Sequence, residues 1–77
     1  MTDSSPWVFA YDRLHRSGWT IGDTAFAKPP GMAWRVVGSN GENLIRAEGR
    51  TRDEAWQAAL EQARAVGMLR GGAVPLR

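Results

Sequence analysis

The 77-residue sequence contains no cysteine, one histidine and one lysine. Without cysteine the chain has no disulfide framework, thiolate metal site or cysteine nucleophile, and it fits a reducing compartment such as the cytoplasm. With His15 as its single histidine, it has no pair of histidines for a zinc site, and Ser–His–Asp catalysis has little support. We therefore expect neither a metal nor a cofactor.

Long apolar runs are also missing. No run approaches the roughly 18 residues that a membrane helix needs, and the first residues, MTDSSP, are polar and acidic, unlike a signal peptide. We expect a cytoplasmic protein without membrane contact. The composition, 43% hydrophobic with four Trp, still supports one small core. We expect a single domain over residues 6–69, with flexible tails at 1–5 and 70–77.

The net charge is only +2, from ten basic and eight acidic residues. Nine of the ten basic residues are arginine, whose planar fork suits phosphate and carboxylate groups. An arginine-rich, lysine-poor chain equally reflects the base composition of a genome. The charge therefore permits nucleic-acid binding without requiring it.

The strongest local pattern predicts a helix over about 52–66. Thr51 and Glu54 have the spacing of a capping box, in which each side chain bonds the backbone N–H of the other residue. Gly67 suits the left-handed position that ends a helix. A broad apolar stripe at helical spacing follows the cap: Ala55, Trp56, Ala59, Leu60, Ala63 and Val66.

A hairpin is predicted before this helix, because Asn40-Gly41 is a strong signal for a two-residue turn. That turn places Ser39 opposite Glu42 and Arg35 opposite Arg46. The alternation gives one face that suits a core, with Trp34, Val36, Ile45 and Ala47. The other face carries Arg35, Val37, Leu44 and Arg46.

A further strand is expected over 19–27, followed by a turn at residues 28–31, Lys-Pro-Pro-Gly. Gly22-Asp23 indicates either a bulge or an earlier turn within this segment.

The segment 6–16 fits two structures. As a helix it places Trp7, Ala10, Tyr11 and Leu14 on one face and leaves Phe9 on the polar side. As a strand it alternates Trp7, Phe9 and Tyr11. We favour the helix, because Ser5-Pro6 suits a helix start and Ser17-Gly18 suits its end.

The predicted fold class is therefore α+β. We expect a two-layer domain with the order helix, three antiparallel strands, helix, and with both helices on the Trp34 face of the sheet. Trp34 and Trp56 are expected to meet in the core, with Trp7 beneath them.

This order of elements, together with the sequence of residues 49–60, resembles the double-stranded RNA-binding domain. Gly49, the hydroxyl of Thr51, Ala55 and the Ala-rich continuation match that family's last strand and helix. Asp53 and Trp56 stand where the family has lysine, and the turn at 28–31 lacks the family's histidine. A similar sequence pattern occurs in antitoxins of the HicB type and in the arm-binding domains of phage integrases.

The resemblance implies recognition of duplex RNA by its shape and phosphates. Arg13, His15 and Arg16 on the first helix would then touch the minor groove. Lys28, Arg50 and Arg52 would meet phosphates, although Asp53 and Glu54 would repel a phosphate and favour a self-capped helix start. We expect no catalytic residues and no small-molecule ligand, because the carboxylates are scattered and the domain is small.

A protein-interaction function is the alternative. The face with Arg35, Val37, Leu44 and Arg46 suits an acidic protein or a phosphate chain, or is simply a solvated outer face. A homodimer through the edge of the third strand, or an antitoxin-like complex with a small toxin, would be further forms of this function.

Overall fold

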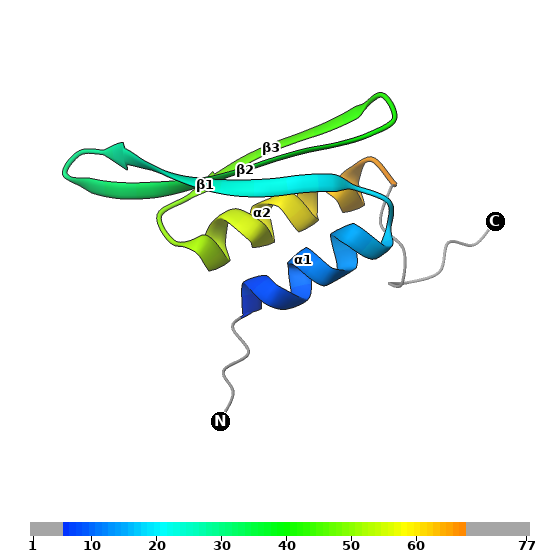
Figure 1. Ribbon diagram of the computed structural model, residues 1–77, viewed down its shortest axis with the longest axis horizontal. Helices are drawn as coiled ribbons and strands as arrows, with labels where there is room; N and C mark the ends of the chain where they lie inside the picture. Colours follow the sequence, from blue (N-terminus) through cyan, green and yellow to red (C-terminus); the bar gives the residue numbers. More distant parts are fainter. Residues whose placement is uncertain (1–5, 68–77) are drawn as a thin grey trace.

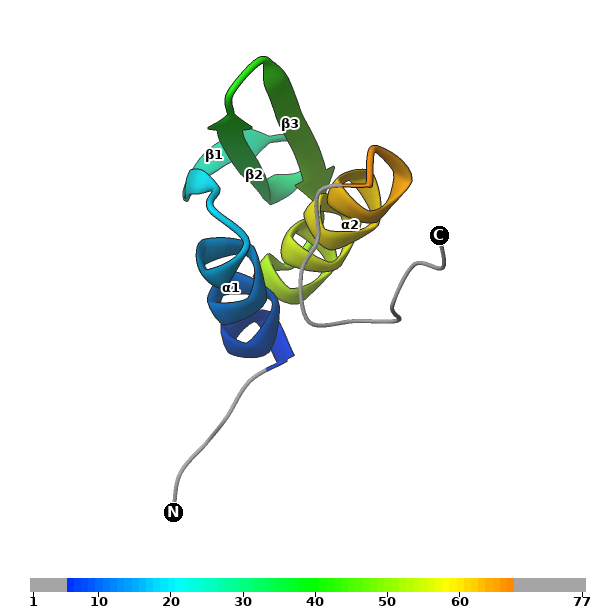
Figure 2. The same ribbon diagram turned by 90° about the vertical axis from the view of Figure 1, so that its right-hand side faces the viewer.

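The helix–strand–strand–strand–helix order is confirmed in the computed structural model, which describes residues 6–67 (Figure 1). Both helices lie on one face of an antiparallel sheet with strand order β1-β2-β3, and no element of residues 6–67 covers the other face (Figure 2). The expected tails at 1–5 and 70–77 lie outside the described residues. The elements are α1 (Pro6–Arg16), β1 (Thr20–Lys28), β2 (Gly31–Asn40), β3 (Asn43–Gly49) and α2 (Arg52–Ala65).

The first segment is a helix, and the alternative of a strand is wrong. Ala10 and Leu14 of α1 are buried, whereas Phe9 is 63% exposed on the polar side. Gly18 follows the helix with a φ of +93°, a conformation that glycine adopts without the steric cost of a side chain. The apolar stripe predicted from helical spacing is therefore the face that packs.

Both ends of α1 are satisfied by groups distant in sequence. The backbone N–H of Trp7 donates to Oδ1 of Asp53 at 3.0 Å, and Nδ2 of Asn40 donates to the carbonyl of Ser17 at 3.0 Å. The first amides and last carbonyls of a helix lack partners within the helix. Asp53 and Asn40 therefore tie α1 to α2 and to the β2–β3 hairpin.

β1 pairs with β2 without interruption, from Thr20 opposite Ser39 to Lys28 opposite Gly31. The bulge or early turn expected at Gly22-Asp23 is wrong. Gly22 lies opposite Val37 on the uncovered face, where a Cβ would meet only open space. The glycine therefore fits the regular ladder, and the turn is formed at residues 29–30, whose Pro-Pro bond is cis.

The turn between β2 and β3 differs from the predicted one. Asn40 pairs with Asn43, so the loop is Gly41-Glu42 rather than Asn40-Gly41. Gly41 has a φ of +66° and Glu42 does not have a positive φ, the sign pattern of a type II′ turn with glycine at its first central position. This choice leaves the Asn40 side chain free to cap α1, and it shifts the register by two residues.

The shift by two keeps every side chain on its predicted face, because side chains alternate with a period of two. Val36, Ile45 and Ala47 are buried under the helices, as expected. At this face a Cβ on Gly38 would lie 2.6 Å from Cγ1 of Ile21, so the two strands pack here only because residue 38 is glycine.

Aromatic rings join the two helices. Trp56, which is 1% exposed, has its ring centroid 6.1 Å from that of Trp7 and 5.5 Å from that of Tyr11. Trp34 is half-buried and packs against Arg52. Both helices begin at the same end of the molecule and run in the same direction (Figure 1). Neither helix within residues 6–67 is long and apolar enough to cross a membrane.

Candidate functional site

Asp23 is the centre of a polar cluster between β1 and the start of α2. Its Oδ2 accepts hydrogen bonds from Nε of Arg52 at 2.7 Å and from Nε1 of Trp56 at 2.9 Å. The Arg52 guanidinium also lies over the rings of Trp7 and Trp34, 3.9 and 4.8 Å from their centroids. A cation over an aromatic face is attracted by the ring electrons. The Asp23 side chain is only 16% exposed and is largely shielded from water, whereas the Arg52 side chain is 39% exposed.

Burial alone raises the pKa of Asp23, because a buried carboxylate loses hydration. The hydrogen bonds from Arg52 and Trp56 and the charge of Arg52 outweigh burial and lower the pKa below the ordinary value of 3.8. Asp23 is therefore ionised at neutral pH and fastens β1 to α2.

The start of α2 is occupied by its own side chains. The Thr51 half of the predicted capping box forms, with Oγ1 of Thr51 accepting from the N–H of Glu54 at 3.1 Å, but the return bond from Glu54 to the N–H of Thr51 is wrong. Oε1 of Glu54 accepts from the N–H of Arg50, the residue before the cap, at 2.8 Å. Asp53 holds the first turn of α1. Arg52, predicted to meet a phosphate, is thus bound to Asp23, and two acidic side chains surround the helix start.

Lys28, another predicted phosphate contact, lies beside a carboxylate. Its Nζ is 3.8 Å from Oε1 of Glu48. Lys28, Glu48 and Arg50 help to line an open hollow of about 230 Å³. This volume is below the usual range for small-molecule sites, and the hollow carries two basic and two acidic side chains. The full lining is Lys28, Ala33, Glu48, Gly49, Arg50 and Glu54.

The three predicted contacts on α1 lie in its C-terminal half. Arg16 is exposed and pairs with Asp12 at 3.0 Å, and the exposed ring of His15 has its centroid 4.2 Å from that of Tyr11. Arg13 is half-buried, and its Nε has no hydrogen-bond partner among residues 6–67. Figure 1 shows that this end of α1 and the β1–β2 turn lie at opposite ends of the molecule. The six predicted nucleic-acid contacts therefore do not converge on one patch.

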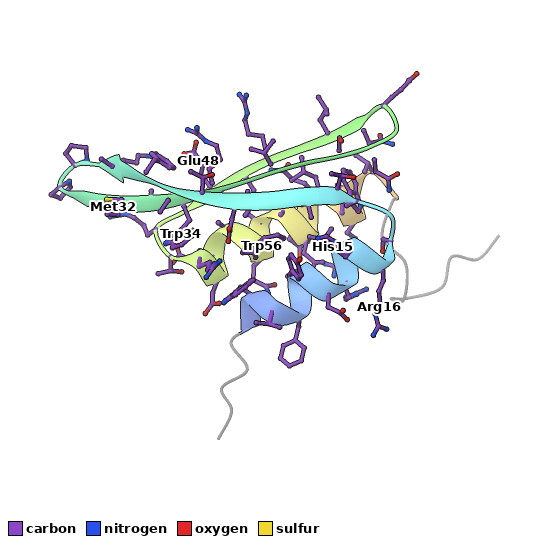
Figure 3. All side chains as sticks on the ribbon, in the orientation of Figure 1. His15, Arg16, Met32, Trp34, Glu48 and Trp56 are labelled. Carbon is purple, nitrogen blue, oxygen red and sulfur yellow. The ribbon has the colours of Figure 1, made fainter. Side chains whose placement is uncertain are left out.

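The uncovered face of the sheet does bring its predicted residues together. Arg35, Val37, Leu44 and Arg46 share this face, as their alternation predicts, and all four are exposed. Val37 is 49% exposed and Leu44 is 75% exposed. Figure 3 shows Glu48 on the same side, pointing away from the helices. We call this set of exposed side chains, with Lys28, Arg35, Val37, Leu44, Arg46 and Glu48, the outer face.

The predicted opposition of Arg35 and Arg46 is wrong. The register places Arg35 opposite Glu48, and Arg46 opposite Val37. Oε2 of Glu48 accepts from Nε and Nη2 of Arg35 at 3.0 and 2.9 Å. The turn that forms one residue later thus replaces a repulsive pair of like charges with an ion pair.

Three further residues take part in these contacts, and two of them, Phe26 and Asp23, were missed by sequence reasoning. Glu48 shares the alternation of Leu44 and Arg46, and that spacing was sufficient to place it on the outer face. Phe26 lies on β1, and its ring centroid is 4.5 Å from the Arg35 guanidinium. No spacing in the sequence indicated this contact. Asp23 is an inward-pointing acid on a strand, which indicates a buried basic partner.

Within residues 6–67 no group of three or more histidine, cysteine, aspartate or glutamate side chains could hold a metal ion. No family model, curated protein or solved structure matches this chain. Its function must therefore be inferred from the chemistry of its own surfaces.

Proposed function

We propose that this protein is a small non-enzymatic interaction domain whose outer face binds an acidic, partly apolar surface of another protein. The observation that carries this proposal is the position of Leu44, 75% exposed on a sheet face that no helix of residues 6–67 covers. Next to it on the sheet lie Val37 and Arg46. Apolar side chains surrounded by arginine are typical of surfaces that bind protein partners.

Charge indicates the chemistry of the partner. Lys28, Arg35 and Arg46 give the outer face three positive charges, and Glu48 is its one carboxylate. Glu48 is engaged by both Lys28 and Arg35, whereas Arg46 has no acidic side chain within 4 Å in the described part of the chain. A partner with carboxylates would satisfy Arg46. A second copy stacked on this face would bring like charges together.

Several observations favour a protein over a nucleic acid. Arg52 is held by Asp23, and Asp53 and Glu54 would repel a phosphate at the start of α2. The exposed apolar residues of the outer face are the aliphatic Val37 and Leu44, and the ring of Phe26 is half-buried beneath the Arg35 guanidinium, whereas nucleic-acid bases stack on accessible aromatic rings. The six predicted contact residues, all within residues 6–67, form no single basic patch, which supports the same choice.

A photo-crosslinking experiment in the organism that encodes the protein tests this proposal. The photoreactive amino acid p-benzoylphenylalanine replaces Leu44 on the outer face or, as a matched control, the exposed Gln57 on α2. We expect discrete protein adducts from position 44 that position 57 does not give. Arg46→Glu in the position-44 protein should abolish them, because it reverses the charge that meets the partner.

Two results would overturn the proposal. One is the same adduct pattern from positions 44 and 57. The other is a set of adducts that nuclease treatment removes, which would identify a nucleic acid. An NMR titration with a duplex RNA of about 16 base pairs, at low and moderate salt, provides the second test. Saturable shifts at Arg13, His15, Lys28 and Arg50 would restore duplex RNA as the ligand.

A further inference from the structure

The two edges of the sheet are protected differently. At the edge of β3, Gln62 of α2 accepts from the N–H of Arg46 at 3.0 Å and donates Nε2 to the carbonyl of Arg46 at 2.9 Å. A side-chain amide thus occupies the place of a neighbouring strand. The third-strand edge, where sequence reasoning placed a homodimer, is closed at its midpoint.

The directions of the backbone groups in β1 follow from this contact. Because the backbone N–H and C=O of Arg46 bond to Gln62, they point away from β2. The N–H and C=O of Val37, which lies opposite Arg46, therefore point toward β1. Gly22, opposite Val37, therefore bonds back to β2. Alternate residues of an antiparallel strand point in opposite directions. The backbone groups of Ala25 and Ala27 consequently point outward from the free edge of β1.

This outward edge is unprotected. No hydrogen-bond partner for the outward groups of Ala25 or Ala27 is present among residues 6–67, and both residues are exposed. Sheet edges are usually protected by charged side chains. Here the nearest charges are engaged elsewhere, Asp23 with Arg52 and Lys28 with Glu48. The four residues between them, at 24–27, are uncharged.

We propose that a second copy of this chain pairs with the edge of β1, antiparallel and with Ala25 at the two-fold axis. This register places Asp23 of one copy opposite Ala27 of the other, and Thr24 opposite Phe26. No like charges are opposed, Ala25 faces its own copy once on the axis, and every other pair occurs twice, as two-fold symmetry requires. The resulting six-stranded sheet sets two outer faces side by side. This inference does not depend on the proposed function.

The paired stretch is short, so the association is weak. It spans five residues per copy, far less than the surface of a standard stable interface, and we expect a dissociation constant of about 10–1,000 μM. The protein is therefore a monomer in dilute solution and a dimer at high local concentration.

Sedimentation equilibrium of the full chain, from about 10 μM to 1 mM, tests the pairing with three variants. Ala25→Pro removes an N–H that makes no bond within the sheet, so the fold is retained, as for proline on edge strands. Ala25→Lys keeps the N–H but opposes two ammonium groups across the axis. Ala25→Val keeps both the N–H and neutrality and serves as the matched control.

We expect the wild type and Ala25→Val to approach twice the 8.5 kDa monomer mass as concentration rises. Ala25→Lys should weaken the association at least tenfold, and Ala25→Pro should stay monomeric with an unchanged circular dichroism spectrum. The amides of Ala25 and Ala27 should gain exchange protection with concentration. A wild type that stays monomeric at 1 mM, or association that Ala25→Lys leaves intact, overturns the inference. Arg46→Glu should leave this association unchanged, which separates it from the proposed function.

Discussion

The two faces of the sheet carry similar residues, arginine beside large apolar side chains, but place them in different surroundings. At the covered face, Arg52 of α2 is bound by Asp23, and its guanidinium lies over the rings of Trp7 and Trp34. On the outer face, Arg46 has no acidic partner within 4 Å among residues 6–67, and Leu44 is 75% exposed. Arg52 stabilises the fold, because it binds a carboxylate that is shielded from water and packs on aromatic rings. Arg46 lies beside exposed aliphatic side chains and is available to a partner.

The largest expected difference between the faces is in packing. Trp56→Ala should lower the free energy of unfolding by about 3–5 kcal/mol, because it removes a fully buried ring, whereas Leu44→Ala should change it by about 0.5 kcal/mol or less. Urea denaturation followed by circular dichroism measures both. If Trp56→Ala does not fold, Trp56→Phe provides a milder test. Equal losses on the two faces would contradict the comparison.

Two neighbouring glycines test the faces at the backbone. Gly38→Ala places a Cβ against Ile21 on the covered face and should cost about 1–3 kcal/mol. Gly22→Ala, on the outer face, meets no atom within 4 Å and should change stability by about 0.5 kcal/mol at most, or increase it slightly. Thermal unfolding of the two variants shows which substitution lowers stability more. A Gly22→Ala protein that loses as much as Gly38→Ala would show that the outer face is also tightly packed.

Asp23, at the covered face, should make the stability of the fold depend on pH. The folded-state pKa of Asp23 is lowered, so its contribution is fully present above the unfolded pKa, near 3.9, and is lost as pH falls through the folded pKa. At pH 7 we expect Asp23→Asn to cost about 1–2 kcal/mol, reduced by the partial exposure of Arg52.

Glu48→Gln on the outer face is the matched control for Asp23→Asn. We expect it to cost at most about 1 kcal/mol, because Glu48 and its partners are exposed. Denaturation from pH 7 to pH 2 measures both variants. An Asp23→Asn deficit that persists unchanged at pH 2 would show that charge is not what Asp23 contributes.

The smallest expected effect concerns the edge of β3. Gln62→Ala removes two bonds to the backbone of Arg46 and should cost about 0.5–1 kcal/mol. Hydrogen exchange of the Arg46 amide should become faster. Gln57→Ala, an exposed change on the same helix, should alter neither quantity. An unchanged Arg46 exchange rate would mean that Gln62 does not close this edge.

Local patterns were sufficient to predict the elements of the fold. Val66, predicted on the apolar stripe, follows α2 and is 50% exposed, but the Thr51 cap, the rest of the apolar faces of the two helices and the alternation in the strands correspond to the structure. Each depends on neighbouring residues and their spacing, so a sequence reports it directly. The outer face was predictable for the same reason, because a register error of two residues preserves alternation.

Contacts between distant residues could not be predicted in the same way. Asn40 was placed in a turn because Asn-Gly is a strong local signal, but its amide caps the carbonyl of Ser17, 23 residues away. Arg52 was taken for a phosphate ligand because its partner Asp23 lies 29 residues earlier. Such pairings depend on how the helices dock on the sheet, and no local pattern encodes that arrangement.

The cap of the first helix has a consequence for protein synthesis. Trp7 is made before the carboxylate that accepts its amide, because that carboxylate belongs to Asp53, 46 residues later. Until that residue has been made, α1 lacks this acceptor at its first turn, and the face meant for α2 has nothing to pack against. The domain is therefore completed only by its last helix. Nascent chains that end before Asp53 should be clients for chaperones.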